Sequence, residues 1–349
     1  YWILGMTFIA SAVTGVVLWE LINPVSMLHR GLIFGVGAAW MVGELRAGDE
    51  IHGFDPRTAD YIVGTSAGSV LSSLLGAGVS VEQLIDHQRG NAIVDGPLAG
   101  YSWDYEKATG GHRPSIPRLL GPGSGKLIRR SLAGRARKMP PTAVLAAFMP
   151  AGKGSLERVG HLVEAFTPYG EWSPHDNVWI VALDYESGRR VAFGHENAPK
   201  VPLSDAVMAS CAIPGWFRPV TIEDRTYIDG GAWSATSADL LAGLDLDEVY
   251  VLAPMLSFAM DQPDTVLGRV ERRWRAQVTK RCVTEVGKLR AGGADVTILG
   301  PGPEDLEAMG ANVMDNSRRL SVLETSLRTS VEALRDPDRV GPDHLADVS

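Results

Sequence analysis

A serine flanked by two glycines is the residue of this chain best placed for nucleophilic chemistry. An apolar, strand-like run leads into Gly64-Thr65-Ser66-Ala67-Gly68, and an apolar, helix-like stretch follows it. A strand that turns sharply into a helix exposes the residue at the turn, and small neighbours allow that turn. We therefore predict a nucleophile elbow in which Ser66 is the nucleophile, Gly64 and Gly68 support the turn, and the Ala67 amide points at an oxyanion.

A candidate base follows much later in the chain. Asp229 ends a short strand-like run and enters a turn made by Gly230 and Gly231. An Asp-Gly turn alone is common in proteins, so it becomes informative only together with the serine. His344 also follows both residues, in the chain order of a Ser-Asp-His triad. Because His344 lies in a polar tail, we favour a dyad in which Asp229 takes the Ser66 proton directly as the hydroxyl attacks an ester.

Together with a third block, these stretches resemble the patatin-like phospholipase family. The third block runs from Ala209 to Pro219, and the three blocks stand in the order that the family uses, within a resemblance from about Gly31 to about Pro254. The resemblance implies a serine acyl hydrolase that cleaves lipid esters through an acyl-enzyme, as a phospholipase A, a lysophospholipase or an acylglycerol lipase. It implies no metal ion and no other cofactor, so calcium dependence is not expected.

The glycine-rich loop that forms the oxyanion hole in this family is shortened here. Where the family has Gly-Gly-Gly-x-Arg/Lys-Gly or a close variant, this chain has Gly35-Val36-Gly37 followed by a helix-like stretch. The resemblance implies that the amides of Gly35, Val36 and Gly37 join Ala67 in holding the oxyanion. Loss of one such donor costs on the order of 100-fold to 1000-fold in rate. A second hypothesis therefore stays open, a catalytically weakened scaffold of the same fold that binds lipid or a partner protein in a membrane.

Alternating strand-like and helix-like segments carry these motifs. With 349 residues and 45% apolar content, the chain can bury a large core. We predict a three-layer α/β/α catalytic domain over residues 30–335, with a mostly parallel central sheet. The unbroken apolar run at residues 177–184 predicts a strand covered on both faces. Ser80 with Gln83 predicts the capped start of a helix.

An apolar segment precedes this domain. Residues 1–19 carry no charge, and residues 1–22 approach the length that crosses a hydrocarbon core, roughly 20 residues. We predict a membrane-anchor helix within residues 1–29. One alternative is a helix buried against the domain, a second copy of the chain or a membrane-protein partner. Another is a signal peptide, although no basic region precedes the apolar run.

A basic insertion interrupts the domain at about residues 103–160. Residues 107–156 contain Lys and Arg but no Asp or Glu, whereas the whole chain has a net charge of −8. Such a segment is able to lie on an anionic lipid surface. The alternative is a lid with a solvated basic face that packs on the core. The overall negative charge argues against nucleic acid as a partner.

The remaining features concern location. Cys211 and Cys282 are far apart in sequence and match neither a disulfide framework nor a metal site, which favours a reducing compartment. Residues 336–349 form a polar tail. We therefore expect a membrane-associated protein whose catalytic domain lies on the cytoplasmic side.

Overall fold

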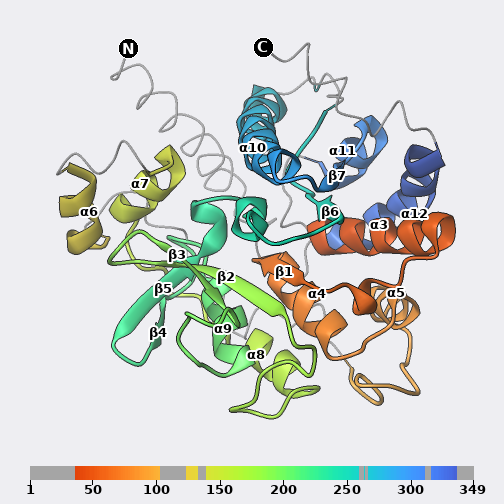
Figure 1. Cartoon of the computed structure of the whole chain (residues 1–349), viewed down its shortest axis with the longest axis horizontal. Coiled ribbons are helices and arrows are strands. Elements are labelled where there is room, and N and C mark those ends of the chain that lie inside the picture. Colours follow the sequence, from red (N-terminus) through yellow and green to blue (C-terminus); the bar gives the residue numbers. More distant parts are fainter. Residues whose placement is uncertain are drawn as a thin grey trace. The chain divides into compact units, whose positions relative to one another are not determined.

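The computed structural model describes residues 36–102, 123–132, 139–258, 263, 266–310 and 316–335. Both helices and strands occur along them, which confirms a mixed α/β fold (Figure 1). The described residues form two compact units. The first is built from Asp60–Gly78 and Trp103–Trp233, and the second from Phe34–Ala59, Val79–Ser102 and Ser234–Ser349.

A five-stranded sheet forms the centre of the first unit. Its strands are β1 (Ile62–Thr65), β2 (Val178–Asp184), β3 (Arg190–Phe193), β4 (Val220–Ile222) and β5 (Arg225–Asp229). β2 is buried along its whole length, as its unbroken apolar sequence predicts, and it pairs with β1, β3 and β5. β4 pairs with β5 at the edge of the sheet.

The described strands do not follow the predicted, mostly parallel arrangement. β1 is parallel to β2, but β3 and β5 run antiparallel to β2, and β4 runs antiparallel to β5. For the pairs β2–β3 and β4–β5, the physical reason is the length of the connection. Residues 185–189 join β2 to β3 and residues 223–224 join β4 to β5, and such short turns join only antiparallel strands.

β1 and β5 share one edge of β2. β3 pairs with Ile180–Leu183 without a break, so it occupies the other edge. Thr65, the last residue of β1, pairs with Val181, and Asp229, the last residue of β5, pairs with Ala182. Because the two strands run in opposite directions along β2, their carboxyl ends meet at neighbouring positions.

Helices of the first unit flank this sheet. They are α4 (Ala67–Gly76), α6 (Gly125–Leu132), α7 (Pro141–Phe148), α8 (Glu157–Glu164) and α9 (Leu203–Ser210). α6 and α7 come from the basic insertion. Apolar residues of α7, among them Ala143 and Ala147, share a buried cluster with Leu183 of β2 and Ile228 of β5. This part of the insertion therefore packs on the sheet, and its function as a lid stays a prediction.

The second unit combines five helices with a pair of parallel strands among its described residues. The elements are α3 (Val36–His52), α5 (Val81–Arg89), β6 (Glu248–Leu252), α10 (Val266–Ala291), β7 (Asp295–Leu299), α11 (Pro303–Met309) and α12 (Arg319–Arg335). α3 packs closely on α12, because a Cβ at Gly43 would lie 2.2 Å from the Ser326 Oγ. The Ser326 hydroxyl donates to the Trp40 carbonyl at 2.8 Å.

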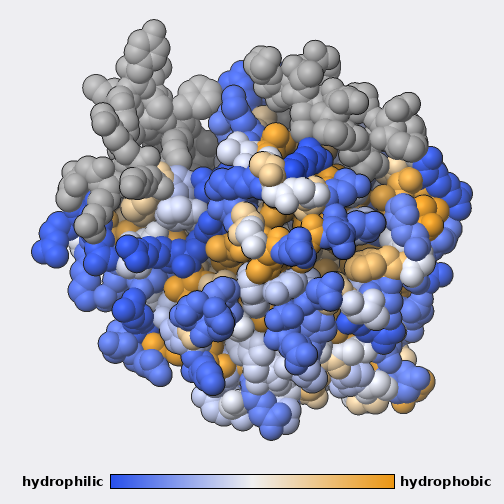
Figure 2. Space-filling view, in the orientation of Figure 1, coloured by the Kyte–Doolittle hydropathy of each residue, from blue (hydrophilic) through white to orange (hydrophobic). Residues whose placement is uncertain are grey.

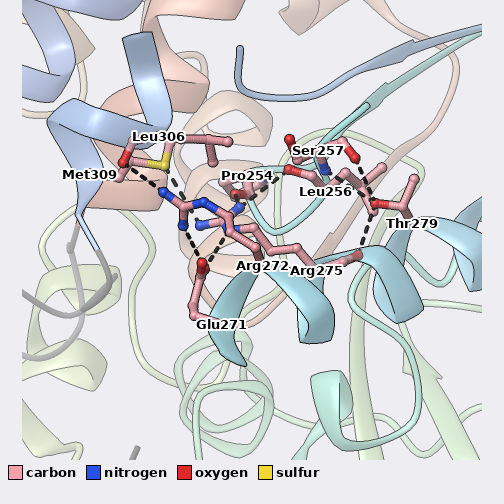
Figure 3. Close-up of polar contacts among 9 residues, drawn as sticks. All are labelled: Pro254, Leu256, Ser257, Glu271, Arg272, Arg275, Thr279, Leu306 and Met309. Carbon is pink, nitrogen blue, oxygen red and sulfur yellow. Dashed lines mark hydrogen bonds and ion pairs between the residues drawn. The ribbon is translucent and has the colours of Figure 1, made fainter. Parts of the chain in front are cut away.

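A buried arginine ties the loop after β6 to α10. The Arg275 side chain is fully buried and donates to the carbonyls of Pro254 at 2.6 Å and Leu256 at 3.2 Å (Figure 3). Its charge is paired with Glu271, which also pairs with the buried Arg272. Buried charges persist when they are paired and hydrogen-bonded in this way. The network therefore fixes the course of the chain beyond the end of β6.

Hydrophilic side chains cover most of the face in Figure 2, with smaller apolar patches between them. No helix among the described residues is long and apolar enough to span a bilayer. Several predictions fall outside those residues: the anchor helix in residues 1–29, most of the basic insertion between residues 103 and 138, and the tail with His344. They stay predictions.

Candidate active site

Ser66 occupies a sharp turn between β1 and α4. It has φ 55° and ψ −124°, a backbone conformation that residues other than glycine rarely adopt. α4 begins at the next residue, Ala67. The structure thus has the strand, turn and helix that the elbow motif predicts, and strain of this kind gathers at functional sites.

The two glycines of the motif are not equivalent. A Cβ at Gly64 would lie 2.3 Å from the Gly68 carbonyl oxygen and 2.5 Å from the Ser72 Oγ, so only glycine lets α4 pack this closely on β1. A Cβ at Gly68 would meet no atom within 4 Å. The close approach expected of both glycines therefore applies at Gly64 alone.

The peptide groups of Ser66 are held by side chains of α9, of α4 and of Cys211, the residue after α9. Its N–H donates to the Ser210 Oγ at 2.9 Å, and the Ser210 hydroxyl donates to the Val181 carbonyl at 2.7 Å. Its carbonyl accepts from the Ser69 hydroxyl at 2.6 Å and from the Cys211 thiol at 3.4 Å. Hydrogen bonds of this kind help a strained backbone to persist.

Asp229 ends β5 with its side chain almost completely buried, at 4% exposure. One carboxylate oxygen accepts the Gly231 N–H at 2.7 Å, and the Asp229 N–H donates to the Ala212 carbonyl at 3.0 Å. The Ser66 side chain lies close enough to this carboxylate to stabilise its charged form. The structure therefore brings together the predicted nucleophile and the predicted base.

Burial changes the proton affinity of this carboxylate. Loss of solvation raises the pKa of Asp229 from 3.8 to about 6, because burial penalises the charged form. The Ser66 side chain and the hydrogen bond from the Gly231 N–H act in the opposite direction, since both stabilise the carboxylate. A carboxylate with a pKa near 6 is ionised at neutral pH and is a stronger base than an exposed aspartate.

The glycines after Asp229 provide the space for this turn. A Cβ at Gly230 would lie 2.5 Å from the Val181 carbonyl oxygen and 3.0 Å from the Thr65 Cγ2. A Cβ at Gly231 would lie 3.0 Å from the Asp229 Oδ1. Both glycines therefore sit where a side chain would press on β2, on β1 or on the carboxylate itself.

Cys211 is the other nucleophilic side chain beside the elbow. It is buried, and loss of solvation, together with the nearby charge of Asp229, raises the pKa of its thiol. A thiolate, not a thiol, is the reactive form of cysteine. Cys211 therefore stays protonated at neutral pH, which leaves Ser66 as the candidate nucleophile.

The predicted oxyanion donors fall into different parts of the chain. Ala67 is the first residue of α4, directly after Ser66, and the amides of a first helical turn have no acceptor within the helix. Val36 and Gly37 begin α3 in the second unit, where a Cβ at Gly37 would lie 3.3 Å from the Pro254 side chain. Gly35 lies outside the described residues. The role of this glycine segment stays a prediction.

Sequence reasoning did not single out Ser210. It lies inside the small-residue block Ala209–Pro219, where nothing in the letters separates a serine that packs from one that bonds to a distant turn. The signal that could have found it is local chemistry. A strained residue between a strand and a helix needs an acceptor for its N–H, and the hydroxyl of a buried serine is able to accept that hydrogen bond.

The sheet, the strained serine turn and the buried carboxylate belong to an α/β protein. The chain belongs to the patatin-like phospholipase family: the family described as "Patatin-like phospholipase" matches residues 34–242, more than half of its length. That span contains Ser66 and Asp229. Membership in this family supports lipid acyl hydrolase activity in general.

A second likeness is short. A 41-residue stretch is 54% identical to the methylamine utilization ferredoxin-type protein MauN of Paracoccus denitrificans and 51% identical to MauN of Methylorubrum extorquens. The match covers 12% of this chain and 14% of each of those proteins. It concerns a small part of both chains.

Proposed function

We propose that this protein is a serine hydrolase of lipid esters in which Ser66 is the nucleophile and Asp229 is the general base. The observation that carries the proposal is the strand register: Ser66 directly follows the end of β1, the buried Asp229 ends β5 at the neighbouring position of β2, and the Ser66 side chain stabilises the charged carboxylate. Proton transfer during attack requires a nucleophile and a base within hydrogen-bond reach of each other.

The reaction follows from the proton affinities of the two groups. Ser66 Oγ attacks the ester carbonyl carbon while its proton passes to Asp229, and the Ala67 amide at the start of α4 donates to the oxyanion. The alcohol leaves with the proton from Asp229, and the acyl group stays on Ser66. Asp229 then takes a proton from a water molecule, which attacks the acyl ester, releases the carboxylic acid and restores the Ser66 hydroxyl.

Family membership supports a lipid ester as the substrate. Phospholipids, lysophospholipids and acylglycerols all present an acyl ester carbonyl of the same reactivity, and they differ in head group and in the number of chains. We therefore propose this substrate class as a whole, with the lipid surface as the place of reaction.

The test combines covalent labelling with hydrolysis. A fluorophosphonate that reacts with activated serines is expected to label wild type and not Ser66→Ala, and Asp229→Asn is expected to slow labelling. A panel of phosphatidylcholine, lysophosphatidylcholine and diacylglycerol then identifies the ester that is cleaved. Folding of every variant is checked by thermal unfolding.

Two results would contradict this proposal. A folded wild-type protein that is not labelled and cleaves no ester of the panel would overturn the proposal and favour the weakened scaffold. Labelling that persists in Ser66→Ala would show that another residue is the nucleophile.

A further inference from the structure

The N–H of Ser66 needs a partner that neither neighbouring element supplies. β1 ends at Thr65 and α4 begins at Ala67, so Ser66 belongs to neither ladder. Its φ of 55° is also unlike that of a strand or a helix. A backbone N–H that is removed from water without an acceptor is costly. The acceptor here is a side chain, the Oγ of Ser210, at 2.9 Å.

Ser210 is fully buried and has both sides of its hydroxyl in use. It is the last residue of α9, and its hydroxyl accepts from Ser66 and donates to the Val181 carbonyl of β2 at 2.7 Å. A serine hydroxyl has one proton to donate. The Ser66 N–H therefore donates to Ser210, and the single proton of the Ser210 hydroxyl is donated to the Val181 carbonyl.

The Val181 carbonyl, which accepts the second of these hydrogen bonds, lies beside the segment that carries Asp229. Val181 pairs with Thr65, and its carbonyl oxygen lies where a Cβ of Gly230 would approach to 2.5 Å. Gly230 directly follows Asp229. One buried hydroxyl thus joins the serine turn to the segment of β2 that packs under the turn after Asp229.

We infer that Ser210 is a positioning residue, which holds the Ser66 turn in register with Asp229 by linking the Ser66 N–H to β2. The inference rests on the proposed function, because the geometry that it protects is that of the Ser66–Asp229 pair. A misplacement of about 1 Å in such a pair costs on the order of 100-fold in rate. Ser210 itself does not touch the reacting atoms.

α9 also offers a matched control. Ser204 lies in the same helix, is 2% exposed, and its Oγ has no hydrogen-bond partner among the described residues. Ser204→Ala removes the same atom from the same helix at equal burial. It leaves the elbow untouched.

The experiment compares Ser210→Ala with Ser204→Ala in the full chain. We expect Ser210→Ala to lower kcat and the rate of fluorophosphonate labelling by roughly 10-fold to 100-fold, with KM within about 2-fold of wild type, since only alignment of the pair is lost. Ser204→Ala is expected to keep wild-type kcat. Hydrogen exchange supplies a second readout: the peptide that contains Ser66 should exchange faster in Ser210→Ala than in either other protein.

Several outcomes overturn the inference. These are an unchanged kcat in Ser210→Ala, an equal loss in Ser204→Ala, or unchanged exchange at Ser66. If Ser210→Ala does not fold, Ser210→Cys takes its place, because a thiol of similar size is a weak acceptor and should give the same losses. If wild type proves inactive, the proposed function fails, and hydrogen exchange alone decides whether Ser210 holds the turn.

Discussion

Thr65 and Asp229 pair with consecutive residues of β2, Val181 and Ala182, although their strands run in opposite directions. Each is the last residue of its strand, so the carboxyl ends of β1 and β5 meet at neighbouring positions along β2. This register brings the Ser66 side chain close enough to the Asp229 carboxylate to stabilise its charged form. The candidate site is therefore built by strand pairing.

The pH dependence of hydrolysis should follow Asp229. Because burial raises the pKa of this carboxyl to about 6, the base is protonated and inactive below that pH and ionised above it. We expect kcat/KM to rise about tenfold per pH unit below 6 and to level off above 7. Initial rates between pH 4.5 and 8.5 on a neutral ester check this, and a profile that stays flat through pH 6 would contradict it.

Asp229→Asn should remove activity and add stability at high pH. The folded protein holds the Asp229 proton more tightly than the unfolded chain does, so ionisation between pH 3.8 and about 6 lowers the free energy of unfolding. The shift of roughly two units corresponds to about 3 kcal/mol. We therefore expect the variant and wild type to unfold alike at pH 4 and the variant to be the more stable at pH 8. Denaturant unfolding at both pH values measures the difference.

Gly64→Ala and Gly68→Ala form a matched pair within the elbow. The first places a methyl group 2.3 Å from a backbone oxygen, and overpacking of this kind costs about 1 to 3 kcal/mol. The second meets no atom within 4 Å and lies in a helix, where alanine is favoured over glycine by up to about 1 kcal/mol. Thermal unfolding should separate the two, and equal melting temperatures would refute the asymmetry.

Arg275→Met should destabilise the second unit strongly. The substitution leaves the buried Glu271 without one of its two partners and frees the carbonyls of Pro254 and Leu256. Breaking a buried ion pair costs about 3 to 5 kcal/mol. Arg328→Met is the control, because Arg328 is exposed and solvent screens its pairs with Glu304 and Glu332. Similar losses in urea unfolding would show that burial does not matter here.

Features that depend on neighbouring residues could be predicted from the sequence. The elbow is set by residues 64–68, and the structure has its strand, turn and helix in the predicted order. The Ser80–Gln83 capping box is likewise confirmed, because both of its hydrogen bonds join residues three positions apart. Short-range geometry of this kind is visible in spacing alone.

The reversal of β5 could not be predicted in the same way. Its hairpin turns through Glu223 and Asp224, and Glu223 has φ 54°. Asparagine and glycine are the residues that usually announce such a turn, and neither is present. The hydrogen bond between Ser66 and Ser210 could not be predicted for a related reason. The two residues are far apart in the sequence, and only the packing of α9 on β2 brings them together.

The shared edge of β2 makes the chemistry of this protein sensitive to alignment. Side chains on a strand alternate between the two faces of a sheet, so a shift of β5 by one residue, about 3.3 Å, would turn the carboxylate to the opposite face. The same shift would turn the buried Tyr227 and Ile228 to the opposite faces as well. The register that packs the core therefore also aims the base.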